Sequence, residues 1–149
     1  MIIREAATDD LDPLSLLFDS YRQFYHKQSN ISGAKEFLNE RITRDESVIF
    51  VAEENEKIVG FAQLYPLFSS TRMNRLWLLN DLFVKEDFRG KGISKLLLEK
   101  CFELGRETHA CGVMLETERS NIIGNQLYQQ TGFQLIESNF YFRENISEG

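Results

Sequence analysis

The spacing of hydrophobic residues changes twice over residues 77–106. It predicts a strand, then a charged loop, then a helix. Residues 77–84 are apolar apart from Asn80 and Asp81, which is typical of a buried strand. Residues 85–91 are mostly charged. Apolar residues then recur at helical spacing: Ile93, Leu96, Leu97, Cys101 and Leu104. The pattern predicts a central strand leading into a helix with one apolar face.

The same reasoning predicts further strands and helices on both sides of this segment. The predicted strands are residues 2–5, 47–53, 58–67 and 113–117, and the last hairpin pairs 133–136 with 139–143. One predicted helix has Asp12 as its N-cap and runs to Tyr25; a second begins near Ser32, and a third spans 121–130. Pro66 is expected to end its strand, because proline has no N–H to donate. The tail 144–149 is polar.

Gly90 and Gly92 stand where the loop becomes the helix. The first turn of a helix has unpaired N–H groups and the positive end of the helix dipole, and glycine lets a ligand approach the backbone. The segment therefore predicts a phosphate-binding turn. It lacks the G-x-x-x-x-G-K-[ST] pattern of the nucleotide P-loop and the third glycine of the G-x-G-x-x-G dinucleotide motif.

Two motifs carry a resemblance to a known family. Arg89-Gly90-Lys91-Gly92-Ile93-Ser94 resembles the R/Q-x-x-G-x-G/A signature of the GNAT family, the Gcn5-related N-acetyltransferases, with Ser94 in place of Gly or Ala. Downstream, Asn121 to Phe133 resembles the family's N-x-x-A-x-x-L-Y-x-x-x-G-F, with Gly124 in place of Ala. Both motifs occur in the family's order. The chain is identified from them as a member of this family.

The resemblance implies an α/β GNAT fold, a mixed, mostly antiparallel, splayed sheet with helices on both faces, in a single domain over 1–149. It also implies acetyl-CoA as co-substrate and no metal. The implied cofactor-binding residues are Leu82, Phe83, Val84, Arg89, Gly90, Lys91, Gly92, Ile93, Ser94 and Asn121. The strand residues would pair with the pantetheine arm, and an N–H near Phe83 would stabilise the oxyanion. A bulge and splay in strand 77–84 come from the resemblance alone.

Tyr128 corresponds to the family's tyrosine that points at the CoA sulfur, and is the candidate general acid. A phenol with a pKa near ~10 is protonated at neutral pH and can donate to a departing thiolate. The alternative is a core tyrosine. Asn121 either contacts pantetheine or caps the helix that follows it, or does both.

Asp81 is the candidate catalytic base, with a structural role in the sheet as the alternative. As neighbours in a strand, Asn80 and Asp81 are expected to face opposite ways, and the sequence does not say which faces the acceptor. Glu116 and Glu118 are other candidate carboxylates.

Composition excludes some partners and locations. A net charge of −6 is unlike that of a broad nucleic-acid binder and compatible with cationic substrates. No apolar run approaches the ~20 residues of a membrane span, and the N-terminus lacks the pattern of a signal peptide. Cys101 and Cys111 have no metal-binding spacing, and Cys101 is expected in the core. A cytoplasmic protein is predicted, acting on a small molecule, with no nucleic-acid or membrane partner.

The function predicted from these residues is transfer of acetyl from acetyl-CoA to a primary amine by direct attack. The first choice of acceptor is a small cationic, polyamine-like amine. The alternatives are a protein lysine or N-terminus and, in a different class, a CoA-binding regulatory domain without turnover. The aromatic residues Phe140, Tyr141 and Phe142 near the C-terminus predict a homodimer.

Overall fold

The computed structural model describes residues 1–146, which fall into two compact units, the first Met1–Glu116 and the second beginning at Thr117. Masked residues 147–149, part of the predicted polar tail, lie outside the described residues. The elements of the first unit are β1 (Ile2–Glu5), α1 (Leu11–Phe24), α2 (Ile31–Thr43), β2 (Val48–Glu54), β3 (Lys57–Ser69), β4 (Asn74–Val84), α3 (Ile93–Glu107) and β5 (Val113–Met114). Short 3-10 turns at Thr8–Asp10 and Glu86–Phe88 complete it. The second unit contains α4 (Ile122–Gln130).

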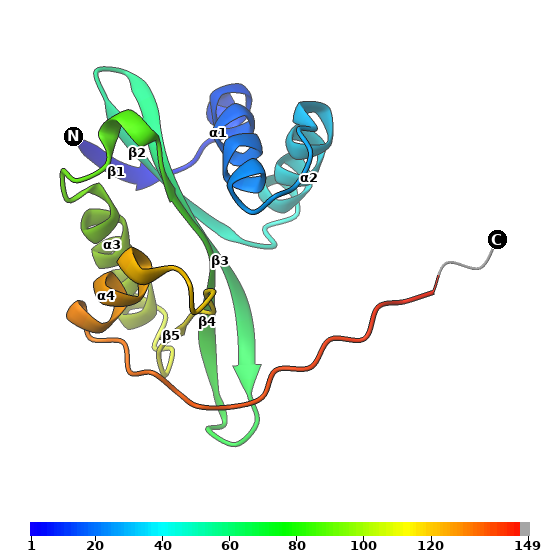
Figure 1. Ribbon diagram of the computed structural model, residues 1–149, viewed down its shortest axis with the longest axis vertical. Coiled ribbons are helices and arrows are strands. Elements are labelled where there is room, and N and C mark those ends of the chain that lie inside the picture. Colours follow the sequence, from blue (N-terminus) through cyan, green and yellow to red (C-terminus); the bar gives the residue numbers. More distant parts are fainter. Residues whose placement is uncertain (147–149) are drawn as a thin grey trace. The chain divides into compact units, whose positions relative to one another are not determined.

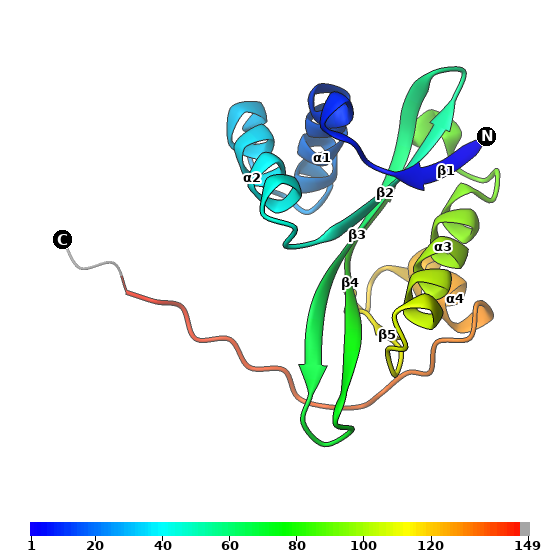
Figure 2. The same cartoon turned by 180° about the vertical axis from the view of Figure 1, so that it is seen from behind.

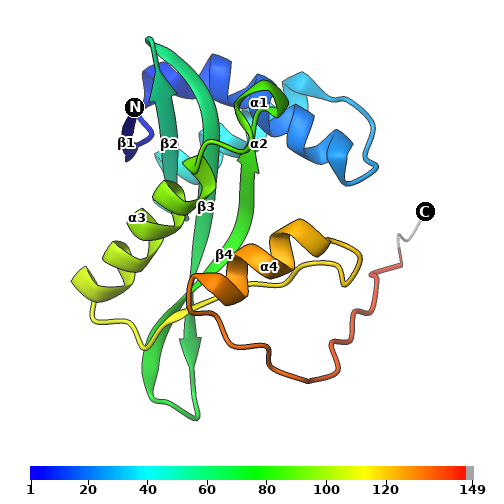
Figure 3. The same cartoon turned by 60° about the vertical axis from the view of Figure 1, so that its left-hand side comes forward.

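The five strands form one sheet in the order β1-β2-β3-β4-β5. Neighbouring strands are antiparallel except for β4 and β5, which are parallel. The two longest strands, β3 and β4, run side by side down the sheet (Figure 3). The predicted mixed, mostly antiparallel sheet is confirmed.

Helices cover both faces of this sheet, as predicted. Helices α1 and α2 lie on one face and α3 on the other (Figures 1 and 2). The core beneath α1 and α2 contains Leu14, Leu17, Phe18, Ala34, Leu38, Ile49, Val51 and Phe61. On the α3 side, Ile93, Leu97, Leu98 and Cys101 are buried. Burial raises the pKa of the Cys101 thiol to about 12, which fits the core position expected from the sequence.

The starts of the first two helices differ from the prediction. Asp10, not Asp12, is the N-cap residue of α1, but its side chain makes no capping bond to the helix. Its carboxylate instead accepts the Ala7 N–H and two N–H groups of Arg4, at 2.7, 2.7 and 2.8 Å. Likewise Asn30, not Ser32, caps α2: its side chain accepts the Gly33 N–H at 3.0 Å. In both helices the N-cap residue lies two positions earlier than predicted.

Pro66 does not end its strand, so that prediction was wrong. β3 continues to Ser69, and Pro66 pairs with Trp77 of β4. β2 pairs with β3 only as far as Leu64, so β3 is an edge strand from Tyr65 onwards. Proline is tolerated there because no neighbour requires its missing N–H.

Two other predicted strands are shorter or absent. β5 contains only Val113 and Met114, and residues 133–146 form neither helix nor strand, so the predicted final hairpin was wrong. A two-stranded hairpin is marginal in water unless one face is buried. The large apolar side chains of this segment are exposed: Leu135, Ile136, Phe140, Tyr141, Phe142 and Ile146.

Across residues 1–146, no helix has the length and apolar character needed to cross a membrane.

Candidate active site

A β-bulge interrupts β4 at Asn80. Gln63 of β3 pairs with Asp81, and Leu64 pairs with Leu79, so Asn80 is an extra residue without a partner of its own on β3. A bulge bends its strand and changes the direction of nearby side chains. The bulge that only the resemblance implied is therefore present.

β4 and β5 separate just before this bulge. Their pairing is limited to Trp77 with Val113 and Leu78 with Met114. Within the described residues, no strand pairs with the remaining edge of β4, from Leu79 to Val84. The splay leaves a backbone edge with unpaired groups, which an extended ligand bearing amides can join as an extra strand.

Backbone alternation shows which groups this edge presents. The Lys85 N–H donates to the Val59 carbonyl of β3 at 2.8 Å. Since successive residues of a strand point their backbone groups to opposite sides, Leu82 and Val84 point theirs away from β3, and Phe83 points its own towards β3. The outward N–H groups thus flank Phe83 rather than belonging to it.

Asp81 lies on the sheet face covered by α1 and α2, beside its pairing partner Gln63, and is only 3% exposed. Its carboxylate accepts N–H groups from Gln63 at 2.5 Å and from Asn80 at 2.9 Å. The expectation that Asn80 and Asp81 face opposite ways was wrong, because the bulge breaks the alternation of the strand. Burial raises the pKa of Asp81 above that of an ordinary carboxyl, while hydrogen bonds from Gln63 and Asn80 act against the rise.

Two tyrosines lie near this carboxylate. The Tyr21 hydroxyl of α1 donates to the Asn80 carbonyl at 3.1 Å, which supports the bulge. Burial raises the pKa of Tyr21, and the charge of Asp81 adds to the effect. Burial and the same charge raise the pKa of Tyr65 to about 12. Both phenols are therefore neutral at physiological pH.

Gly90 and Gly92 both have left-handed backbone, with φ of 78° and 81°, and Gly92 is the N-cap of α3. No side chain caps this helix start, and a Cβ built on either glycine would meet nothing within 4 Å. Ile93 is buried and Ser94 half-buried in the first turn. The first turn of α3 therefore has backbone N–H groups that can bind an anion, and the space beside its two glycines is open.

The two basic residues of this turn have local contacts. The Arg89 Nε donates to the outward carbonyl of Val84 at 2.9 Å, and its guanidinium lies over the rings of Phe24 and Phe83. The Lys91 amine lies 5.2 Å from the centre of the Phe88 ring. Arg89 thus joins the glycine turn to the end of the open β4 edge.

In the second unit, Asn121 caps α4 by accepting the Gly124 N–H at 3.1 Å. A Cβ at Gly124 would collide with the Asn121 side chain, so an alanine here requires that amide to move. Tyr128 is half-buried in α4, with its ring 5.8 Å from that of Phe133 in a T-shaped contact. The N-cap role of Asn121 is confirmed; the catalytic role of Tyr128 stays a prediction.

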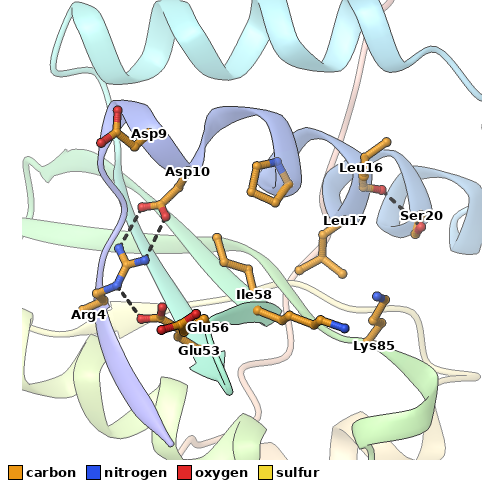
Figure 4. A pocket seen from close by; sticks show the side chains of 12 residues that line it. Arg4, Asp9, Asp10, Leu16, Leu17, Ser20, Glu53, Glu56, Ile58 and Lys85 are labelled. Carbon is orange, nitrogen blue, oxygen red and sulfur yellow. Dashed lines mark hydrogen bonds and ion pairs between the residues drawn. The ribbon is translucent and has the colours of Figure 1, made fainter.

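The other candidate carboxylates, Glu116 and Glu118, are exposed. A separate pocket of about 410 Å³ lies where the start of α1 meets β1 and the β2–β3 hairpin (Figure 4). Its polar lining includes the ion-paired group Arg4, Asp10 and Glu53, and none of the predicted site residues lines it.

Sequence reasoning missed Gln63, which is fully buried and bonded to Asp81. The available signal was a polar residue within the otherwise apolar run of the strand predicted at 58–67. An amide there needs partners, because burying one without hydrogen bonds is costly.

Comparison with known proteins agrees with this geometry. The sequence model described as the Acetyltransferase (GNAT) family matches residues 14–133. The uncharacterized N-acetyltransferase YhfO of Bacillus subtilis is 42% identical over 134 residues, which cover 90% of each protein. A crystal structure of a probable acetyltransferase superposes with a TM-score of 0.90, at 36% identity and full coverage of both chains. A shorter match, 35% identical over 81 residues and covering 52% of this chain and 53% of the relative, is to the spermine/spermidine N(1)-acetyltransferase of Bacillus subtilis.

A splayed sheet and a glycine-rich helix start of this kind are the framework of an acyltransferase that uses coenzyme A thioesters. The chain belongs to the GNAT family of acetyltransferases, and is an acetyl-CoA-dependent N-acetyltransferase.

Proposed function

We propose that the acetyl acceptor is the primary amine of a small cationic compound and that Asp81 removes its proton during direct attack on the thioester. The observation that carries this proposal is the buried Asp81 carboxylate at the bulge, directly before Leu82, whose backbone groups face outward from β4. A carboxylate with a raised pKa is a better base than an ordinary one. Two of its lone-pair positions are used by Gln63 and Asn80, which leaves others to accept a proton.

The acetyl-CoA site is proposed along the β4 edge and the start of α3. Leu82 and Val84 offer outward backbone groups to the amides of the pantetheine arm, and one of their N–H groups stabilises the oxyanion of the thioester carbonyl. The N–H groups that begin at Gly92 bind the pyrophosphate, and Arg89 and Lys91 add positive charge. Phe83 contributes packing. The whole chain, 1–149, is proposed to act as one domain.

The second unit is proposed to supply the general acid. Tyr128 donates a proton to the departing thiolate, an assignment that rests on its place in the N-x-x-A-x-x-L-Y motif. Asn121 is assigned to pantetheine as well as to its helix cap.

The choice of a cationic acceptor rests on three observations. The chain has a net charge of −6, Asp81 is a buried carboxylate on the sheet face covered by α1 and α2, and part of the chain is similar to a spermine/spermidine N(1)-acetyltransferase. The exposed carboxylates Glu116 and Glu118 are further candidates for attracting the cation. The rival acceptor is a protein lysine or N-terminus. A cytoplasmic location is part of the proposal.

Replacing Asp81 with asparagine tests the role of the base. We expect kcat with a polyamine at neutral pH to fall by about 10²-fold, the lower end of what a positioned base contributes. The loss should shrink as pH approaches ~10.4, where more of the amine is already neutral. Asp45→Asn, which changes an exposed carboxylate at the end of α2, is the matched control and should keep the wild-type rate. Wild-type turnover by Asp81→Asn would return Asp81 to a structural role.

We also propose a homodimer. Six large apolar side chains between Leu135 and Ile146 are exposed, and a second subunit would bury them. Sedimentation equilibrium at high protein concentration should give a mass of about twice the 17.4 kDa of one chain. Removing residues 133–149 should return the mass to that of a single chain. A monomer mass for the full chain would reject this proposal.

A further inference from the structure

We propose that Gln63 is a positioning residue, oriented by Ser47, which holds the Asp81 carboxylate ionised and aligned for the acetyl-transfer reaction. This inference rests on the proposed role of Asp81 as base. It adds two residues, on β3 and just before β2, that neither sequence motif contains.

Hydrogen bonds fix the direction of the Gln63 amide. The Ser47 hydroxyl donates to the Gln63 Oε1 at 2.8 Å, so the opposite end of the amide, Nε2, faces Asp81 and donates to its Oδ2 at 2.5 Å. An amide has one accepting and one donating end, so the bond from Ser47 selects the orientation. Gln63 is fully buried, and no bulk water replaces this donor.

The surroundings of Asp81 make this donor important. Within the described residues, Asp81 forms no ion pair. The titratable groups that face it are Tyr21 from α1 and Tyr65 from β3. The charge of Arg41 in α2 lowers the pKa of Tyr65, against the effect of burial. None of these three forms an ion pair with the carboxylate. Its two amide donors are Gln63 and Asn80, and the second is an exposed residue of the bulge. The buried Gln63 is therefore the rigid member of the pair.

The buried Gln63 amide is also unusual for its position. It lies in the middle of β3, where Phe61, Ala62 and Leu64 are buried apolar residues. An apolar residue of similar volume would fill the space without the cost of burying an amide. The polar choice makes physical sense if the ionised state of Asp81 matters.

The test compares Gln63→Met, which keeps the length of the side chain and removes the donor, with wild type. We expect the pKa of Asp81 to rise by about 1, because the carboxylate loses a hydrogen bond. The pKa is measured by carboxyl ¹³C NMR titration, and the Asp81 signal is assigned by its absence in Asp81→Asn. The acidic limb of the kcat/KM profile should move to higher pH by the same amount, since the base is protonated over a wider range. Ser47→Ala should shift both values in the same direction by less, and Ser47→Thr should restore them.

Each result has a distinct meaning. An unchanged Asp81 pKa in folded Gln63→Met and Ser47→Ala would overturn the inference. The Ser47 variant is included because Ser47 is only half-buried, so its replacement leaves no hole in the core. If the Asp81 pKa rises while the acidic limb of the kcat/KM profile stays fixed, Asp81 is not the base. That result would contradict the proposed mechanism, although the effect of Gln63 on the Asp81 carboxyl would stand. Loss of stability without a change in either pH readout would mean a purely structural role and would also overturn the inference.

Discussion

Gly92→Glu is expected to lose acetyl-CoA binding by more than about 10²-fold while the protein keeps its fold. A glutamate at the N-cap of α3 places a negative charge in front of the N–H groups proposed to bind the pyrophosphate. Juxtaposed like charges cost several kcal/mol, and each 1.4 kcal/mol is a tenfold change in affinity. A Cβ at Gly92 would meet no protein atom within 4 Å, so the substitution creates no clash at that atom. Isothermal titration calorimetry with acetyl-CoA measures the loss.

Backbone strain must be separated from this effect, because Gly92 has a φ of 81°. Gly92→Ala introduces the same strain, roughly 1–2 kcal/mol, without the charge, and should retain measurable binding. Arg89→Ala should weaken binding less than Gly92→Glu, since the backbone donors remain. Wild-type affinity in a folded Gly92→Glu variant would remove the pyrophosphate site from the start of α3.

Tyr128→Phe is expected to lower kcat by about 10²-fold or more, with little change in the Kd for acetyl-CoA. A positioned general acid contributes a factor of this size, and phenylalanine keeps the ring while removing the proton donor. The ring contact with Phe133 should survive, so stability should change little. Steady-state kinetics with a good acceptor, together with calorimetry, separates the two quantities.

Tyr141→Phe provides a matched control for this variant, because Tyr141 is a tyrosine of the same unit with 86% of its surface exposed. It should turn over at the wild-type rate. If Tyr128→Phe does the same, the thiolate leaves without help from this phenol and Tyr128 is a packing residue.

The sequence predicted the parts of the fold that depend on hydrophobic periodicity. The apolar stripe of residues 93–104 gave α3, and the continuous apolar runs gave β2, β3 and β4. Helix starts were predicted less well: before α1 the Asp10 carboxylate is held by Arg4 of β1, a contact that the local pattern does not record, and at α2 the cap is Asn30 rather than Ser32. Pro66 was misread for the same reason: whether proline ends a strand depends on whether that stretch of the strand has one neighbour or two.

The candidate site was also predicted only in part. The glycine turn could be predicted from the local sequence, because it depends only on the left-handed backbone of Gly90 and Gly92 and on the helix that follows. The direction of Asp81 did not follow, because one extra residue at Asn80 cancels the alternation on which such reasoning depends. Gln63 and Ser47 were missed because their role arises from pairing across β3 and β4, which no local pattern records.

The most direct test of the central proposal is an acceptor panel assayed for acetyl-CoA-dependent CoA release, with the acetylated products identified by mass spectrometry. The panel contains spermidine-like amines, single alkylamines, lysine-bearing peptides and peptides with free N-termini. We expect the polyamines to turn over fastest, with a rate that rises with pH and an apparent affinity that weakens as salt increases, and with no acetyl group left on the enzyme. Turnover of lysine peptides without polyamines, and without a salt effect, would contradict the proposed acceptor; acetyl-CoA binding without turnover of any amine would contradict the proposed catalysis itself.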